Sequence, residues 1–328
     1  MILPYKYRNV LYSSQAHARE VFVFEGLDAE TETLYRTLDF DLSQLIYKIT
    51  NHFQLTLTHF VFINNHTPNC FVHPFGTFNV LGLHVGFITY FDNFFKENHE
   101  ALFSDMKKPI DHISKIYAWE PDSIAFKICL QYVIYHEVGH IIQKTNSQNT
   151  SNSHDSARYL IEFDADICAA IQIARNILQV VQKVLCETGD MKLAEQIIIY
   201  IISAVATVMW VVLPPDLNYV KVQKNYPHFF IRFLAFYNDV VNYIEASLKS
   251  NNQITEDFDL HKIGLESLRV SLRSMDIIYG KESTENAISV FRQRFPEIKK
   301  DYLEFHQELK TADSTFMKFW EQYVKSRI

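Results

Sequence analysis

The stretch YHEVGHI at residues 135–141 is the most informative part of this sequence. On an α-helix, residues four apart lie on the same face, so His136 and His140 point the same way, one turn apart. Two imidazoles at this spacing can bind a single zinc ion, and the carboxylate of Glu137 beside them can take a proton from a metal-activated water. The pattern is short enough to arise by chance, so its surroundings decide whether it is a metal site.

The residues before the motif predict the helix that it requires. Pro121 and Asp122 form an N-terminal helix signal, and apolar residues recur at helical spacing from Ile124 to Tyr135. The two histidines continue this apolar face toward the core, where unpartnered imidazoles would be costly. Because metal binding removes that cost, we expect a helix at residues 122–145 with a metal ion on its buried face.

A third zinc ligand is expected on the next helix, because catalytic zinc usually has three protein ligands and one open position. Glu162 follows His140 by 22 residues, and the polar stretch at residues 145–156 between them predicts a loop. Asp166 lies one turn after Glu162, where a carboxylate can accept the free ring N–H of a ligand histidine. Asp164 is about 200° around the helix from Glu162, so we expect it to face elsewhere. The alternative is a solvated acidic face, which the apolar residues around both carboxylates disfavour.

HEVGH and the run EFDAD at residues 162–166 together resemble the HExxH and ExxxD motifs of the gluzincin metallopeptidases. The longer run EFDADICAA looks most like the helix of the CAAX-prenyl-endopeptidase and Oma-like families and of the phage-exclusion Lit-like peptidases. The resemblance implies a zincin-like catalytic core and a hydrolase that cleaves a protein or peptide substrate with a metal-activated water. It implies one zinc ion per chain, bound by His136, His140 and Glu162, with Asp166 orienting a ligand histidine and Glu137 as the general base.

A partial match to a further motif lies downstream, at residues 226–232. Those families often carry HPxxxxR, and this chain keeps Pro227 and Arg232 at that spacing but has Tyr226 at the His position. The resemblance therefore leaves two candidates for stabilising the oxyanion, the hydroxyl of Tyr226 and the ring of His228. Arg232 would be structural or would orient the substrate.

The composition predicts a mainly helical protein with a large core. Of the 328 residues, 48% are hydrophobic and only eight are glycine. The net charge of −7 gives no broad attraction for nucleic acid, and no glycine-rich nucleotide-binding motif is present. Four scattered cysteines, which we expect to be buried free thiols, and an N-terminus without an apolar signal segment both fit the cytoplasm.

One apolar segment leaves membrane association open. Residues 197–213 are seventeen consecutive uncharged residues, just under the length that usually spans a bilayer. A helix buried in a helical domain would look the same, and the near-zero mean hydropathy favours that interpretation. We therefore expect a cytoplasmic protein, with inner-membrane association as the less favoured alternative. The oligomeric state is not predicted.

The part of the chain before the motif predicts a small sheet. Strands are expected at residues 20–25, 53–64 and 79–85, and helices at residues 34–51 and 88–98. By the resemblance, the third strand would be an edge strand that lines the cleft, where its backbone could pair with an extended substrate. His73 and His84 in this area are expected to be ordinary polar residues rather than ligands.

The rest of the chain predicts helices separated by glycine, asparagine and proline. They are expected at residues 122–145, 156–187, 191–213, 227–250, 261–279, 284–294 and from residue 297 to the end, with Pro296 separating the last two. The expected class is α+β, mainly α. A zincin-like peptidase domain would occupy residues 1–250, with its small sheet at 18–86 and its active-site helices at 122–187. A helical C-terminal extension at residues 251–328 would pack on it.

Two classes of function fit these motifs. One is an active peptidase, including a triggered defence enzyme that cleaves one intracellular protein, as the Lit-like resemblance suggests. The other is a non-catalytic zincin-fold binding or sensor module that uses a metal for structure. Glu137 favours the enzyme, because a site that only binds has no need of a general base.

Overall fold

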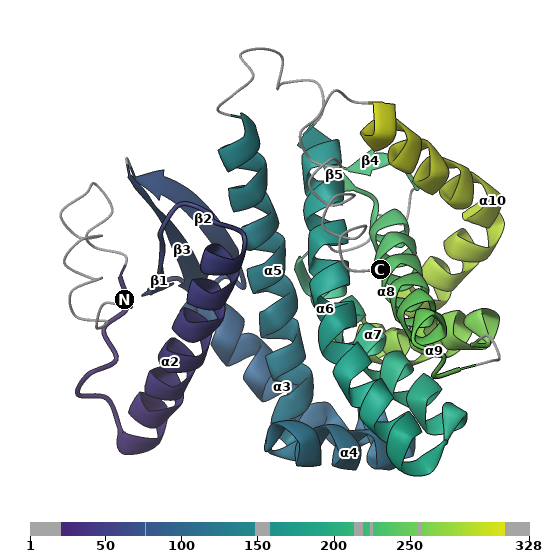
Figure 1. Ribbon diagram of the computed structural model, residues 1–328, viewed down its shortest axis with the longest axis horizontal. Helices are drawn as coiled ribbons and strands as arrows, with labels where there is room; N and C mark the ends of the chain where they lie inside the picture. Colours follow the sequence, from purple (N-terminus) through teal and green to yellow (C-terminus); the bar gives the residue numbers. More distant parts are fainter. Residues whose placement is uncertain are drawn as a thin grey trace. The chain divides into compact units, whose positions relative to one another are not determined.

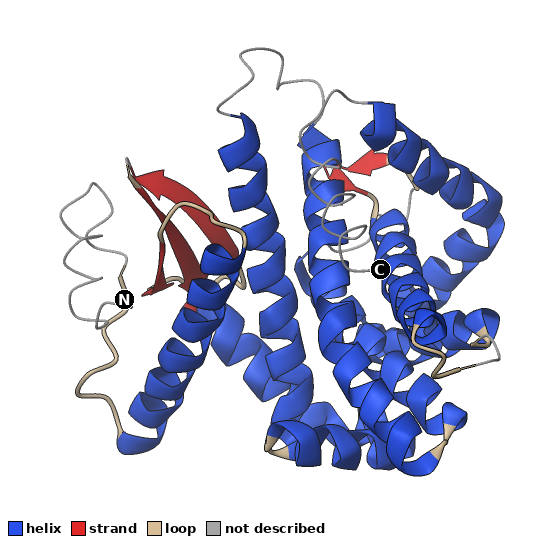
Figure 2. Cartoon of the chain, in the orientation of Figure 1, coloured by secondary structure: helices blue, strands red, loops and turns tan. Residues whose placement is uncertain are grey.

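The computed structural model describes residues 21–75, 77–147, 158–212, 219–223, 226–254 and 258–311. Within these ranges the protein is mainly helical, with a three-stranded sheet and a short two-stranded ribbon (Figure 2). The expected class, α+β and mainly α, is confirmed at this level. The chain forms two compact units: residues up to Asn93 with Glu137–Thr150, and Phe94–His136 with the residues from Ser151 onward.

The first unit contains the sheet, in which β1 (Thr58–Ile63), β3 (Phe78–His84) and β2 (Cys70–Phe75) lie in that order. β1 and β3 pair in parallel, and β2 pairs with β3 antiparallel. All of β1 and nearly all of β3 are buried, as continuous apolar strands usually are. Helix α2 (Ala29–His52) packs against β1 (Figure 1). Its first turn is capped by the side chain of Asp28, which accepts a hydrogen bond from the backbone N–H of Thr31.

Two expectations for this unit were wrong, and one strand was not predicted. The strand expected at residues 20–25 reduces, within the described residues, to an isolated bridge between Val21 and Ile63. Strand β2 was not predicted, because its sequence CFVHPF contains Pro74 and does not alternate cleanly. The third predicted strand, β3, is central rather than at an edge, so its backbone groups are used by β1 and β2 and are not available to an extended substrate.

The second unit is a bundle of helices. Its helices are α4 (Lys107–Tyr117), the first half of α5 (Ile124–Ser147), α6 (Arg158–Thr188), α7 (Met191–Val212), α8 (Phe229–Ser250), α9 (Leu260–Tyr279) and α10 (Lys281–Thr311), with the second half of α3 (Val85–Phe103) and the single turns η1 (Ser104–Met106) and η2 (Pro121–Ser123). Helix α6 packs against α8, and α7 packs against α9 (Figure 1). The ribbon of β4 (Val222–Gln223) and β5 (Tyr226–Pro227) precedes α8, and β5 lies against α6.

The segment that could have crossed a membrane forms α7. Among the described residues, α7 is the one helix that is long and apolar enough to do so, and 78% of its apolar window is buried within the protein. Trp210, near its end, is fully buried and stacks on Phe229 of α8, with ring centroids 3.5 Å apart. A mostly buried apolar helix is typical of a protein core, so the burial favours a core helix over a membrane-spanning one.

The C-terminal helices α9 and α10 pack on other helices of the second unit. Helix α10 contacts α8 and α9, and α9 contacts α7. The expected break at Pro296 is wrong, because α10 runs through this proline. Pro296 has no N–H to donate to the carbonyl of Arg292, four residues earlier. Pro296 and Arg292 are both exposed, so water can bind to that carbonyl instead. Similarly, α5 continues to Ser147, and most of the loop expected at residues 145–156 lies outside the described residues.

Candidate metal site

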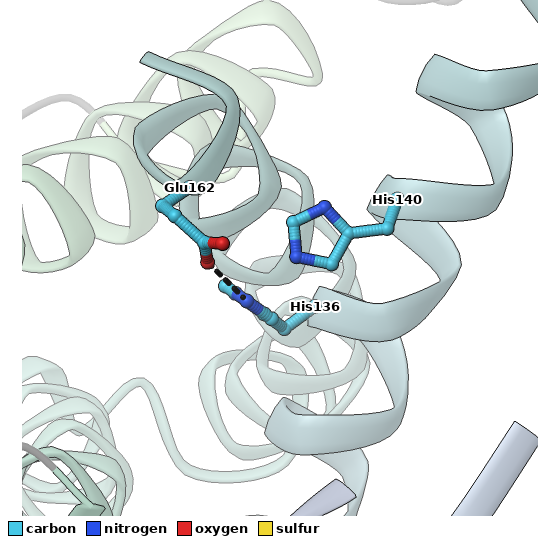
Figure 3. A group of neighbouring side chains, drawn as sticks. All are labelled: His136, His140 and Glu162. Carbon is cyan, nitrogen blue, oxygen red and sulfur yellow. Dashed lines mark hydrogen bonds and ion pairs between the residues drawn. The ribbon is translucent and has the colours of Figure 1, made fainter. Parts of the chain in front are cut away.

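Three side chains from α5 and α6 lie together. His136, His140 and Glu162 each offer one ligand atom, and these atoms are all within 4.8 Å of one another (Figure 3). The two histidines are one turn apart on α5, and Glu162 lies in the second turn of α6. The expectation that these three residues come together is met.

The chemistry of the donor set suits zinc. Two imidazole nitrogens and a carboxylate oxygen are typical ligands of catalytic zinc, and bonds of 2.0–2.1 Å in a tetrahedral site place the ligand atoms roughly 3.3 Å apart. Nε2 of His136 lies 3.2 Å from Oε2 of Glu162. This pair already has that spacing, and with the other ligand atoms no more than 4.8 Å apart the group could hold a metal ion.

Asp166 contacts the other ring nitrogen of His136. Nδ1–H of His136 donates to Oδ1 of Asp166 at 2.9 Å, as a partner that fixes the histidine tautomer would require. Burial acts to lower the pKa of His136, but the hydrogen bonds and negative charges of Asp166 and Glu162 outweigh it and raise the pKa to about 10. The ring thus binds protons strongly, so binding of a metal has to release the proton on Nε2.

Asp166 is itself held by two further side chains. It is fully buried, and it forms an ion pair with Arg232 of α8 and accepts a hydrogen bond from the hydroxyl of Tyr132. Burial acts to raise the pKa of this carboxyl, but the charge of Arg232 and the hydrogen bonds to it lower the pKa to about 2. Asp166 is therefore a carboxylate at every pH at which the protein would work.

Gln143 contacts a ring nitrogen of His140, as Asp166 does for His136. It lies one turn after His140 on α5, it is buried, and its Oε1 lies 2.8 Å from Nδ1 of His140. An amide oxygen can only accept a hydrogen bond, so His140 carries its proton on Nδ1 and keeps Nε2 for a metal.

Glu137 is buried on α5, with 9% of its surface exposed. It lies near Cys70 of β2: burial raises the pKa of the Cys70 thiol well above its usual value, and the negative charge of Glu137 adds to this effect. The prediction that Glu137 acts as a general base is not tested by these contacts.

The two candidates for stabilising an oxyanion differ in their surroundings. His228 is completely buried at the start of α8, where its Nδ1 accepts a hydrogen bond from the backbone N–H of Phe230 and caps the helix. Tyr226 is only partly buried and lies in β5, which contacts α6. The cap gives His228 a structural role at the start of α8.

The other residues considered from the sequence lie outside the His136, His140 and Glu162 group. Asp164 is buried on α6, and Nδ1 of His84 donates to the backbone carbonyl of Thr67 at 3.1 Å, an ordinary polar contact. All four cysteines are free. One correction applies, because Cys186 is exposed rather than buried.

Sequence reasoning missed two residues of the site, Tyr132 and Gln143. Each lies three or four positions from a motif histidine on the same helix, so the helical spacing could have found them. The ring of Tyr132 belongs to the apolar face of α5, while its hydroxyl donates to Asp166.

Comparison of the chain with protein-family models, with curated proteins and with solved structures found no match. The fold and the site thus define a mainly helical α+β protein with a candidate metal site of two histidines and one glutamate. The relationship to the gluzincin peptidases stays a prediction from the motifs.

Proposed function

We propose that the protein is a zinc-dependent metallopeptidase with a zincin-like core. The observation that carries the proposal is the grouping of His136, His140 and Glu162 within 4.8 Å, with Glu137 next to the first histidine in the sequence. Helix spacing explains the two histidines, and the acidic side chain from a separate helix completes the donor set that a catalytic zinc site uses.

The side chains of the site divide into those that bind and those that move protons. His136, His140 and Glu162 would hold the zinc ion, which supplies Lewis acidity toward a peptide carbonyl and a water. Glu137 would accept the proton of the attacking water and pass it to the leaving amine. Tyr226 would donate its hydroxyl hydrogen to the oxyanion.

The resemblance to Lit-like peptidases extends the proposal to biological use. In this extension the protein is a cytoplasmic defence enzyme that cleaves one intracellular protein when triggered. The alternative, a non-catalytic module that binds metal for structure, would retain the three ligands but would not depend on Glu137 as a base.

The first test is metal content. Protein purified without chelator should carry one zinc ion per chain by elemental analysis, and His136→Ala and His140→Ala should each lose it. A wild type that contains no zinc and takes none up afterwards would refute the metal site and the peptidase together.

The second test separates enzyme from binding module. Glu137→Gln keeps the size of the side chain but cannot accept a proton, so it should retain zinc and fold normally while cleavage falls by several orders of magnitude. Glu187→Gln is the matched control, because Glu187 is exposed at the far end of α6. The measurements are zinc content and a proteome-wide cleavage screen in a lysate. Unchanged cleavage by Glu137→Gln would refute this mechanism, and a wild type that binds zinc but cleaves nothing would favour the binding module.

A further inference from the structure

A tyrosine one turn before the motif contacts the same carboxylate oxygen as His136. The hydroxyl of Tyr132 donates to Oδ1 of Asp166 at 2.7 Å, and Nδ1 of His136 lies 2.9 Å from that oxygen. The two residues are four apart on α5, so both side chains leave the helix on one face. Tyr132 is 4% exposed and Asp166 is completely buried, so water does not compete for these hydrogen bonds.

Arg232 reaches the same carboxylate from α8. Its Nε donates to Oδ2 of Asp166 at 2.5 Å and its Nη2 donates to Oδ1 at 2.6 Å. Two parallel bonds from one guanidinium fix the plane of a carboxylate as well as its position. With 6% of its surface exposed and two donors on Asp166, Arg232 is committed to this contact.

The contact between Arg232 and Tyr132 sets the direction of the hydrogen bonds. Nη2 of Arg232 also lies 3.3 Å from the Tyr132 hydroxyl oxygen. Since a guanidinium can only donate, that oxygen accepts, and the hydroxyl hydrogen is directed to Asp166. Oδ1 of Asp166 then takes donors from three side chains, which leaves the carboxylate one orientation in which His136 can donate from Nδ1 and present Nε2 to a metal.

We propose that Tyr132 and Arg232 are positioning residues of the candidate metal site, which act on His136 by fixing the carboxylate of Asp166. This inference rests on the proposed function, because it assumes that His136 binds zinc. It assigns a role to Tyr132, and it replaces the substrate-orienting role considered for Arg232.

The test is the zinc affinity of Tyr132→Phe, measured by competition with a chromophoric chelator. This change removes one hydrogen-bond donor and keeps the buried ring, so the protein should fold. We expect affinity to fall by roughly 10-fold, the lower end for partners around a metal ligand. Tyr135→Phe is the matched control: Tyr135 is equally buried on the same helix, but its hydroxyl accepts from the side chain of Asn176. It should bind zinc like the wild type.

Two further measurements separate positioning from a general loss of structure. In zinc-loaded protein with ¹⁵N-labelled histidine, the Nδ1–H resonance of His136 should shift in Tyr132→Phe but not in Tyr135→Phe. In an Asp166→Asn background, Tyr132→Phe should cause little further loss of zinc affinity, because the route through Asp166 is already impaired. Arg232→Lys keeps the charge but loses the two-pronged contact, and should also weaken zinc binding.

The outcomes distinguish this inference from the proposed function. A wild type that binds zinc together with a Tyr132→Phe variant of equal affinity and an unmoved His136 resonance would overturn the positioning role alone. Equal losses in Tyr132→Phe and Tyr135→Phe would also overturn it, since they would reflect packing. A wild type that binds no zinc would overturn the proposed function and the inference with it.

Discussion

The carboxylate of Asp166 accepts hydrogen bonds from three side chains. Removing this carboxylate should therefore lower the stability of the protein as well as its affinity for zinc. Asp166→Ala would remove the partner of Nδ1 of His136 and would also leave Arg232 buried without a counter-charge. An unpaired buried charge is strongly destabilising, so we expect the free energy of unfolding to fall by about 3–5 kcal/mol, beyond any loss of zinc. Urea unfolding with a chelator present measures the loss of stability without the contribution of bound zinc.

The double variant Asp166→Ala, Arg232→Met is the control for that prediction. It removes both charges, so it should be more stable than Asp166→Ala alone even though it carries one more substitution. If the two variants unfold at the same urea concentration, the buried charge is not the cause of the loss.

Gln143 gives a second prediction at the residue scale. Gln143→Ala should weaken zinc binding by about 10-fold or more, because His140 would lose the acceptor that keeps its proton on Nδ1. Gln131→Ala, a glutamine on the same helix that accepts instead from the side chain of Asn176, should leave zinc affinity unchanged. Calorimetric titration of metal-free protein with zinc provides the comparison, and equal affinities in the two variants would count against the role of Gln143.

The three ligands could be predicted because their identities and spacing are restrictive. His136 and His140 are tied to one helix face by the helical period, and Glu162 follows on a helix that is apolar around it. The residues that hydrogen-bond to the ligands and to Asp166 could not be predicted in the same way. Tyr132 and Gln143 belong to common residue types, and only the folded arrangement shows that their polar atoms meet Asp166 and His140.

At the scale of elements, the proline inside α10 has a cost that can be measured. Pro296 removes one backbone hydrogen bond from an exposed part of this helix. Pro296→Ala should therefore raise the free energy of unfolding, by about 1–3 kcal/mol given the helix propensities of the two residues. Chemical denaturation of both proteins checks this value.

Pro296→Gly is the matched variant, because it restores the N–H but not the helix propensity. It should gain less than Pro296→Ala, by roughly 1 kcal/mol. A destabilised Pro296→Ala would show that the proline ring stabilises α10 through contacts.

Helices were predicted better than strands, because the sequence signal of a helix lies within one segment of the chain. The apolar period of α7 or α8 is set within one segment, whereas a strand is defined by its neighbours. Strand β2, with Pro74 near its end, has a weak sequence pattern and depends on pairing with β3. At Pro296 the prediction failed in the opposite direction. A proline is a strong local signal for the end of a helix, but α10 continues through it and packs on α8 and α9.

At the scale of the whole molecule, one partly buried acid, Asp239, should make the free energy of unfolding depend on pH. Oδ2 of Asp239 in α8 is enclosed and has no hydrogen-bond partner among the described residues. Burial raises the pKa of Asp239 from 3.8 to about 7. Between these values the folded protein binds a proton that the unfolded chain has lost, so the contribution of Asp239 to stability falls as pH rises from about 4 to 7 and is constant above.

Asp239→Asn removes this titration. The difference in the free energy of unfolding between Asp239→Asn and wild type should grow in favour of the variant from pH 4 to pH 7 and then level off. Urea unfolding at a series of pH values measures that difference. A difference that does not change with pH would mean that Asp239 has an ordinary pKa.

The strand order of the sheet has a consequence for synthesis. β1 and β2 emerge first from the ribosome, but neither pairs with the other, and both pair with β3, which ends at His84. No ladder of this sheet can therefore form until β3 has been made and has left the exit tunnel. Until then the apolar residues of β1 have no strand to pair with, so a nascent chain stalled before β3 would be the form most exposed to aggregation and to chaperones.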